Sequence, residues 1–232
     1  GGEVLIAKSC IVGTGGISHP ETGSTGEGFS WLATLGHTIA KNDFALVPIA
    51  LTDAWVKKLA GVTLSDIKLT TFQDGKKQDA RQGNILFTHF GISGPTVLNM
   101  SKDVGELLRE GEVTIALDLF PTVDIGALRK RLQTILIVES NKKIKNAFGD
   151  FVPSALVPAL LEIAKIDGDV FCHSVRHDDR LKLVAFVKAI PLHVKSLLGA
   201  NKAIVSSGGV ALEEVNFKTM QSRLIPGLYL VG

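Results

Sequence analysis

The pattern of apolar and polar residues at the start of the chain predicts a strand, a glycine turn and a helix. Short apolar runs at Val4–Ala7 and Cys10–Val12 predict strands, and Gly13–Gly16 predicts a tight turn after them. Apolar residues then recur at helical spacing over about Glu27–Leu35, a sequence of elements typical of an α/β fold. The expected helix has Phe29, Leu32 and Ala33 on its apolar face, Ser24 or Thr25 as N-cap and Gly36 as C-cap.

The next part of the chain, from residue 49 to about 120, has the pattern of a β-rich module. Ile67 and Leu69 alternate with polar neighbours, which is the period of a strand, and Asp74-Gly75 is a hairpin turn signal. A proline suits the first turn of a helix, so Pro95 is expected to begin one. The elements we expect are strands within Val62–Phe72, at Ile85–Phe87 and at Val113–Leu119, and a helix from Pro95 to about Leu108.

Helical periodicity dominates from Asp124 to Gly199, and a strand pattern returns at Ala203–Val205, which leads into Ser206–Val210. Pro158 interrupts one of the helical segments, so we expect that helix to begin near the proline. This order predicts that a large insertion, first β-rich and then helical, interrupts an α/β domain. The apolar helix faces are formed by Leu128, Leu132, Ile135 and Leu136, by Leu156, Leu160, Ile163 and Ala164, and by Leu183, Phe186, Val187 and Ile190.

Composition and charge narrow the class of protein. The chain has 232 residues with 25 Lys and Arg against 23 Asp and Glu, a net charge of +2, so we expect no nucleic-acid partner. No apolar run approaches the roughly 18 residues of a membrane-spanning helix, so we expect no membrane association. The two cysteines, Cys10 and Cys172, favour a reducing, cytoplasmic location over a secreted disulfide scaffold. The N-terminus lacks a signal-peptide pattern, and both ends read as cut from a longer protein.

The glycine turns and the histidines are the main candidates for chemistry. Gly13–Gly16 lets the backbone approach a ligand closely, although an ordinary tight turn has the same pattern. Gly23–Gly28 is not a P-loop, because no lysine follows its last glycine. Cys172–His177 has metal-ligand spacing but also the charges of a solvated turn, so we expect no metal site, and the basic run Lys142–Lys145 is more typical of a solvated face. His89 stands between an apolar strand and a second glycine turn, where a ligand-facing role and a structural role are both open.

Three blocks of the chain, taken in order, match the signature of a known family. The first is Gly13–Phe29 (GTGGISHPETGSTGEGF) with Leu35–His37, and the second is Leu86–Pro95 (LFTHFGISGP). The third block consists of Ser207–Val210, Glu214, Thr219–Ser222 and Pro226–Tyr229. Together, the three blocks resemble the BaiN-type (YhiN-like) family of NAD(P)/FAD-dependent oxidoreductases.

The resemblance implies a flavoprotein oxidoreductase with an interrupted cofactor domain. Residues 1–48 and 203–232 would form a partial FAD-binding domain like that of glutathione reductase, 49–123 a β-barrel-like part of an insert, and 124–202 its helical part. FAD would be the cofactor, and hydride would pass between NAD(P)H, FAD and an unknown small-molecule organic substrate. The implied cofactor residues are Gly13, Thr14, Gly15, Gly16, Gly208, Gly209, Val210 and Gly232, and the substrate-side candidates for catalysis are His89 and Ser93.

The chain also departs from the family signature. The family's N-terminal Gly-x-Gly-x-x-Gly block, which holds the FAD diphosphate, is absent, and the final block stops at Gly232. We therefore expect a truncated member. The alternative is a non-catalytic binding or interaction module that is derived from this family and has no working flavin site.

Overall fold

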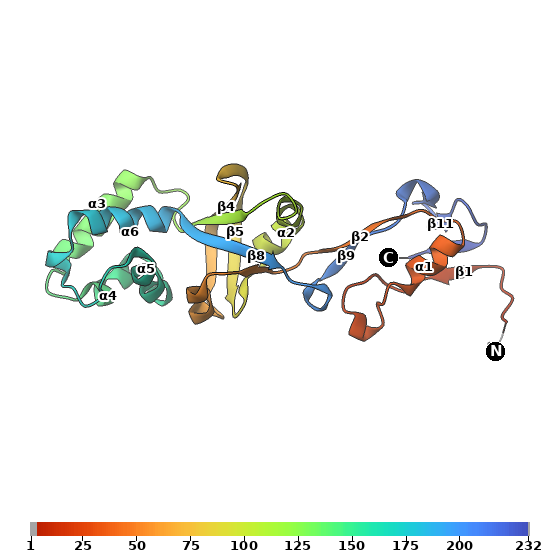
Figure 1. The fold of residues 1–232 in the computed structure, drawn as a ribbon, viewed down its shortest axis with the longest axis horizontal. Coiled ribbons are helices and arrows are strands. Elements are labelled where there is room, and N and C mark those ends of the chain that lie inside the picture. The colour runs from red at the N-terminus through yellow and green to blue at the C-terminus, as the bar shows by residue number, and fades with distance from the viewer. Residues whose placement is uncertain (1–3, 232) are drawn as a thin grey trace. The chain divides into compact units, whose positions relative to one another are not determined.

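The chain forms two compact units, each described here by itself (Figure 1). The computed structural model describes residues 4–231, apart from the side chains of residues 41–44 and 200. Unit 1 joins Gly1–Val47 to Leu198–Gly232, and unit 2 is Pro48–Leu197. The chain thus enters unit 2 after Val47, one residue before the expected boundary, and leaves it after Leu197, five residues before the expected one.

Unit 1 is built from the two ends of the chain. Its first sheet pairs β1 (Cys10–Val12) in parallel with β12 (Leu228–Leu230) and continues through the short strands β11 (Gln221–Ser222) and β10 (Val215–Asn216). A separate antiparallel ribbon pairs β2 (Ile39–Ala45) with β9 (Val205–Val210). The helices are α1 (Glu27–Thr34) and the single turns η1 (Pro20–Thr22), η6 (Ala200–Lys202) and η7 (Leu212–Glu214).

Three local expectations in unit 1 are wrong. Val4–Ala7 forms no strand, because it is exposed and pairs with no strand among residues 4–231. The N-cap of α1 is Gly26 in a left-handed conformation rather than Ser24 or Thr25, whose side chains accept no capping hydrogen bond. The expected strand at Ala203–Val205 begins only at its last residue, and β9 runs through the glycines to Val210, because these residues pair with β2.

The C-terminal end of α1 follows the glycine-based motif that the sequence suggests. Gly36 has a φ of +95°, its N–H donates to the carbonyl of Ala33 at 3.0 Å, and the N–H of His37 donates to that of Leu32 at 3.0 Å. These two bonds define a Schellman motif, in which the left-handed residue satisfies carbonyls at the end of the helix. The chain therefore turns sharply after α1 and places His37 next to the helix.

A closed barrel of six antiparallel strands forms one part of unit 2 (Figure 1). The expected hairpin is confirmed: Asp74 and Gly75 have φ angles of +47° and +76°, as a type I′ turn requires. The expected helix at Pro95 is also confirmed as α2 (Pro95–Leu107). Around the barrel the strands are β3 (Ile49–Leu51), β6 (Gly91–Ser93), β5 (Lys76–Thr88), β4 (Thr63–Gln73), β7 (Val113–Asp118) and β8 (Ile190–Leu197).

Strand β8 corrects the expectation that residues 124–202 are mostly helical. The helix before it ends at Lys188, and β8 closes the barrel by pairing with both β7 and β3. The apolar residues Ile190 and Leu192 are buried and alternate with more exposed neighbours, which is the strand period. Pro191 within this run also disfavours continuation of the helix. Sequence reasoning counted Ile190 as the last member of a helical stripe and so missed the strand.

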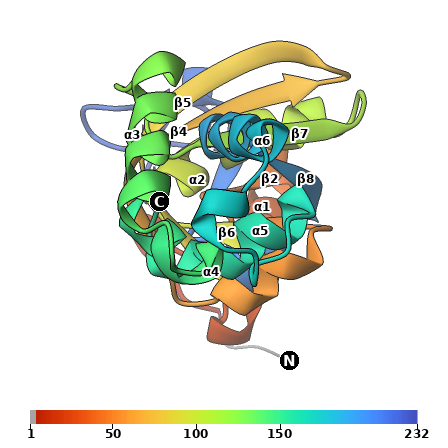
Figure 2. The same cartoon turned by 90° about the vertical axis from the view of Figure 1, so that its left-hand side faces the viewer.

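The other part of unit 2 contains four helices (Figure 2). The helix that Pro158 interrupts does begin beside the proline, as expected, and Asp124 caps α3 by accepting a hydrogen bond from the Ala127 N–H at 2.9 Å. The helices are α3 (Ile125–Val138), α4 (Ile144–Ala147), α5 (Val157–Ala164) and α6 (His177–Lys188), with single turns η3 (Phe148–Asp150), η4 (Ser154–Leu156) and η5 (Cys172–Ser174). The short 3₁₀ helix η2 (Ala54–Leu59) lies instead between β3 and β4 in the chain. No helix within the described residues is long and apolar enough to cross a membrane.

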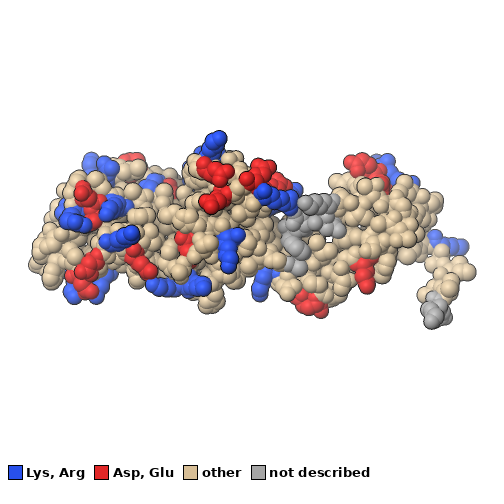
Figure 3. All heavy atoms as spheres, viewed as in Figure 1, with Lys and Arg blue, Asp and Glu red and all other residues tan. Residues whose placement is uncertain are grey.

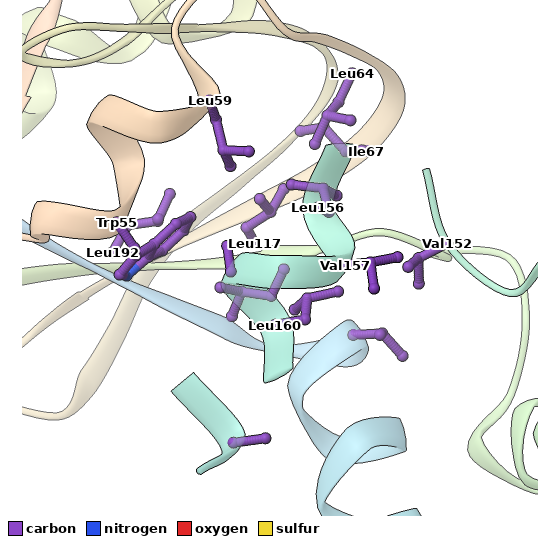
Figure 4. Packing of buried hydrophobic residues seen from close by; sticks show 14 of the residues in the cluster. Trp55, Leu59, Leu64, Ile67, Leu117, Val152, Leu156, Val157, Leu160 and Leu192 are labelled. Atoms are coloured by element: carbon purple, nitrogen blue, oxygen red, sulfur yellow. The ribbon is translucent and has the colours of Figure 1, made fainter. Parts of the chain in front are cut away.

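The barrel and the helices of unit 2 share one hydrophobic core. Figure 4 shows Leu64, Leu117 and Leu192 of the barrel in the same cluster as Leu156 and Leu160 of the helical part. The two parts of the insert therefore stabilise each other. Unit 1 has a much smaller core, which consists of Leu32, Val215, Leu228 and Leu230.

Candidate functional site

A pocket in unit 1 gathers residues from both ends of the chain. Its volume is about 440 Å³, within the range of roughly 300–1,000 Å³ that is typical of small-molecule sites. The turn after β1, helix α1, strand β9 and the segment 212–220 supply its walls. Residues far apart in the sequence therefore form one concave surface.

Glycines keep two walls of the pocket close together. Gly15 has a φ of +72°, and a Cβ atom there would lie 2.8 Å from Ser24 Oγ. A Cβ atom at Gly16 would lie 2.6 Å from the Cβ of Ser206, which is closer than real side chains approach. Gly209 has a φ of +112°, a conformation that side chains rarely adopt. Both glycine turns that the sequence singles out are therefore required by local geometry.

Ser206 of β9 fixes the loop that follows the first glycine turn. Its Oγ accepts hydrogen bonds from the N–H groups of Ile17 at 2.7 Å and Ser18 at 3.0 Å, and lies 2.9 Å from Ser18 Oγ. These bonds join residues almost two hundred positions apart in the sequence. The turn at Gly13–Gly16 is thus held against β9.

The pocket is uncharged and largely apolar. Each residue that lines it is neutral, and the apolar side chains of Leu212, Phe217 and Val231 remain 65%, 61% and 58% exposed. Among residues 4–231, the hydroxyls of Thr14 and Ser24 form no hydrogen bond with protein atoms, so they are available to a ligand. Such a pocket suits an uncharged ring system with a few polar atoms, and it offers no cation to a phosphate.

A buried hydrogen-bond relay lies behind the wall formed by residues 212–220. His37 Nδ1 is 2.7 Å from Glu214 Oε2, and His37 Nε2 is 3.0 Å from Ser222 Oγ. Glu214 also accepts hydrogen bonds from the Thr38 N–H at 3.0 and 3.2 Å. Hydrogen bonds from Thr38 first, and from His37, hold the pKa of Glu214 below its usual value, so this carboxylate is ionised at neutral pH.

This relay has the residue types of a hydrolase triad but a different chemistry. Ser222 is only 6% exposed, and its Oγ accepts hydrogen bonds from the N–H groups of Leu224 at 3.1 Å and Ile225 at 2.9 Å. A catalytic serine needs an oxygen that a substrate can reach, and here both lone pairs are engaged. The relay is a structural one.

The structure brings together most of the expected cofactor residues. Thr14, Gly15, Gly16, Gly208, Gly209 and Val210 all line the pocket. Gly13 does not line it, although it lies in the same turn, and Gly232 lies outside the described residues. That these residues bind a cofactor remains a prediction.

The two candidates for catalysis lie in unit 2. His89 is exposed in the tight connection between β5 and β6, and Ser93 is partly buried in β6 opposite Leu86. The pocket is formed by unit 1 alone. Their catalytic role stays a prediction.

The charged segments of unit 2 are largely neutralised. Lys143 and Lys145 both pair with Asp169, at 2.6 and 2.8 Å, and lower the pKa of that carboxyl to about 2, while Lys142 pairs with Glu139 at 2.6 Å. On the face drawn in Figure 3, charges of both signs are interspersed over the helices. This arrangement favours the expected solvated face for Lys142–Lys145.

His173, next to Cys172, makes contacts that are typical of a structural histidine. His173 Nδ1 lies 2.8 Å from the carbonyl oxygen of Ser140, and its ring stacks on Phe171. Cys172 is buried, which raises the pKa of its thiol. Among residues 4–231, no three His, Cys, Asp or Glu side chains are grouped as metal ligands.

Sequence reasoning missed several residues of the site. Phe29 and Leu32 were assigned only to a helix face, yet both line the pocket. Met220 lines it from a left-handed backbone with a φ of +59°, which is uncommon for a residue with a side chain. His37, Glu214 and Ser222 belong to the matched blocks, but no spacing rule shows that residues so far apart form one relay.

Three characterised relatives align with nearly the whole chain. A protein of Clostridium scindens named 3-dehydro-bile acid delta(4,6)-reductase is 28% identical over 232 residues, and a ribosomal RNA dihydrouridine synthase of Escherichia coli is 27% identical over 234 residues. A ribosomal RNA dihydrouridine synthase of Haemophilus influenzae is 28% identical over 228 residues. The alignments cover 100%, 100% and 97% of this chain but 56%, 55% and 53% of the relatives, so the chain spans about half of their length.

A family model identifies the larger unit. The model described as HI0933-like protein barrel and H2TH domain matches residues 44–205, a span that contains all of unit 2. Its barrel agrees with the closed six-stranded barrel of the structure, and its helical domain agrees with helices α3 to α6. The chain therefore belongs to the HI0933-like family, a flavoprotein family of the BaiN and YhiN type.

Proposed function

We propose that this chain is part of a flavin-dependent oxidoreductase and that the pocket of unit 1 encloses the isoalloxazine and ribityl end of FAD. In this proposal, unit 1 is part of an FAD-binding domain like that of glutathione reductase, and NAD(P)H is the reductant. The observation that carries the proposal is the neutral, glycine-lined pocket, which is built from the first and third of the three matched blocks. Membership in a flavoprotein family supports it.

The residues of the pocket fit a flavin ring. Gly15, Gly16 and Gly209 line the pocket and present backbone rather than side chains to a ligand. The exposed apolar side chains of Leu212 and Phe217 would be covered by the ring, which would remove apolar surface from water. The free hydroxyls of Thr14 and Ser24 can donate hydrogen bonds to polar atoms on its edge. We propose that another part of the protein holds the diphosphate, because this chain lacks the Gly-x-Gly-x-x-Gly turn and no lysine or arginine lines the pocket.

A bound flavin would supply hydride transfer, and the chain would supply binding, orientation and exclusion of water. Ser206 would keep the glycine turn in place, because its Oγ holds the N–H groups of Ile17 and Ser18. His89 and Ser93 remain the proposed substrate-side groups.

The names of the relatives suggest a substrate class. A delta(4,6)-reductase of a 3-dehydro bile acid and a dihydrouridine synthase both describe addition of hydrogen to a carbon–carbon double bond in a ring that also carries a carbonyl. We propose the same chemical class, a ring enone or a uracil ring, for the protein that contains this chain. An RNA substrate is the second candidate, because two of the three relatives are named for ribosomal RNA. The expected absence of a nucleic-acid partner therefore remains open to test.

The test uses the protein in its complete length. We expect it to retain FAD after desalting, and to consume NADH or NADPH when a cyclic enone or a uridine-containing RNA is supplied. The variants Leu212→Ala and Phe217→Ala should lose flavin, because both side chains line the pocket. Leu224→Ala is the matched control, since Leu224 is 49% exposed in unit 1 and lies outside the pocket lining. A colourless protein with no affinity for FAD would support the alternative, a binding module without a flavin site.

A further inference from the structure

We infer that His37 is a positioning residue, which through Glu214 and Ser222 holds the pocket wall formed by residues 212–220 in place for the flavin. The inference rests on the proposed function for the identity of the ligand. It concerns residues that do not line the pocket themselves.

The hydrogen bonds fix the protonation pattern of the relay. Ser222 Oγ accepts two backbone N–H bonds, so its own proton is free to be donated to His37 Nε2. An imidazole that accepts at Nε2 carries its proton on Nδ1, from which it donates to Glu214. In this arrangement the hydrogen bonds run in one direction, from the Ser222 hydroxyl through His37 to the Glu214 carboxylate.

Each member of the relay lies next to residues of the pocket. His37 follows α1, and its N–H is bonded to the carbonyl of Leu32, which lines the pocket. Glu214 ends the turn η7, whose first residue, Leu212, lines the pocket. Ser222 pairs across the sheet with Val215, which also lines it.

Besides the relay, the wall is held by very short strands and by single backbone hydrogen bonds. The N–H of Ala211 donates to the carbonyl of Thr38 at 2.9 Å, and the N–H of Arg223 donates to that of Glu214 at 2.8 Å. Strands β10 and β11 contain two residues each, and Phe217 is exposed. Such short strands are marginal by themselves, and the apolar cluster of unit 1 is small, with Leu32, Val215, Leu228 and Leu230 as its buried members among the described residues. The buried relay ties the wall to the rigid end of α1, and an unmade buried hydrogen bond is costly.

Without the relay, the wall should be displaced in a larger fraction of the molecules, and this should weaken the binding of FAD. A ligand that needs the wall in place binds with an apparent Kd that rises as the fraction of molecules in that state falls. We expect His37→Ala and Glu214→Ala each to raise the Kd for FAD of the complete protein by roughly tenfold. Glu214→Gln should largely restore binding, because the amide oxygen can still accept from His37 and Thr38.

Two readouts separate positioning from general stability. In hydrogen exchange of residues 1–232, His37→Ala should speed exchange at the N–H groups of Thr38, Leu224 and Ile225, which the relay holds, and leave unit 2 unchanged. In the complete protein, the effects of His37→Ala and Ser222→Ala on FAD affinity should be non-additive, since both break the same chain of bonds. Leu228→Ala is the control, because it removes a buried side chain of unit 1 outside the pocket lining and should lower stability without this coupling.

The outcomes distinguish this inference from the proposed function. Unchanged exchange in residues 211–225 of His37→Ala would overturn the inference, as would faster exchange with unchanged FAD affinity. Additive effects of His37→Ala and Ser222→Ala would also overturn it. If the wild-type protein bound no flavin, the proposed function would be overturned. If hydrogen exchange in the wall were nevertheless faster in His37→Ala, the role of the relay in keeping the wall in place would still be supported.

Discussion

At the scale of single residues, the pocket depends on glycines that face hydroxyl groups. The space beside Gly15 is occupied by Ser24, that beside Gly16 by Ser206, and that beside Gly28 by Thr14. Each pair therefore marks a place where two segments of unit 1 are in close contact. The hydroxyl side chains fill space that a Cβ atom would need, so a substitution at any of these positions would force a neighbouring side chain to move.

Replacement of Gly15 by alanine should therefore destabilise unit 1. The new Cβ would stand 2.8 Å from Ser24 Oγ, and the φ of +72° would become strained. A non-glycine residue in such a conformation costs about 1–3 kcal/mol, so we expect the free energy of unfolding to fall by about that amount. The measurement is thermal or urea unfolding of the two proteins under the same conditions.

The control for this prediction lies two positions away. A Cβ atom at Gly13 would meet no heavy atom within 4 Å, and the backbone there is not left-handed, so Gly13→Ala should leave stability nearly unchanged. Equal stability of the Gly15 and Gly13 variants would show that the turn is an ordinary one.

At the scale of elements, the barrel is completed by a strand that follows the helices. Strand β8 pairs with β7 and β3, so the helical part is inserted between the fifth and sixth strands of the barrel in chain order. Leu192 of β8 is fully buried in the core that the barrel shares with α5. The barrel and the helices should consequently unfold together.

Leu192→Ala tests this shared core. Removal of a buried leucine side chain typically costs about 2–5 kcal/mol, and we expect that loss for unit 2. Fluorescence of Trp55, which packs in the same core beside Phe87, and helical circular dichroism should report one coincident transition at a lower temperature. Lys195→Ala on the exposed side of the same strand is the control and should have little effect. Separate transitions for the two signals would mean that the helices form an independent domain.

Local signals in the sequence predicted most elements but not their long-range partners. The turn at Asp74-Gly75, the proline at the start of α2 and the glycine after α1 each act within a few residues, and the structure confirms them. Strand β8 (Ile190–Leu197) closes the barrel by pairing with strands more than seventy residues earlier in the chain. The sequence did not predict this strand, because Ile190 also continues the helical spacing of Leu183, Phe186 and Val187. In the same way, the glycines of the pocket could be identified from the sequence, whereas Ser206 and the relay through His37 depend on contacts between the two ends of the chain.

At the scale of the whole molecule, the two matched ends of the chain form a unit that the barrel and helices interrupt. Parallel pairing of β1 with β12 and antiparallel pairing of β2 with β9 join segments that lie more than 150 residues apart in the sequence. The pocket therefore exists only when both ends are present. In the proposed function, this neutral pocket takes one end of a dinucleotide rather than the whole.

This selectivity can be tested by comparing FAD with riboflavin, which has the same ring and ribityl chain but no phosphate. Residues 1–232 should bind both weakly and with similar Kd values, because they lack the Gly-x-Gly-x-x-Gly turn that holds a diphosphate at a helix N-terminus, and no lysine or arginine lines the pocket. Two or three charge-assisted hydrogen bonds at about 1.5–3 kcal/mol each make a difference of at least ~100-fold in affinity. The complete protein, if it holds the diphosphate elsewhere, should therefore prefer FAD over riboflavin by at least that factor. Fluorescence quenching titrations of both proteins with both ligands measure the two ratios. Tight, stoichiometric binding of FAD by residues 1–232, with weak binding of riboflavin, would show that this chain itself contains the diphosphate site and that the pocket has been assigned to the wrong end of the cofactor.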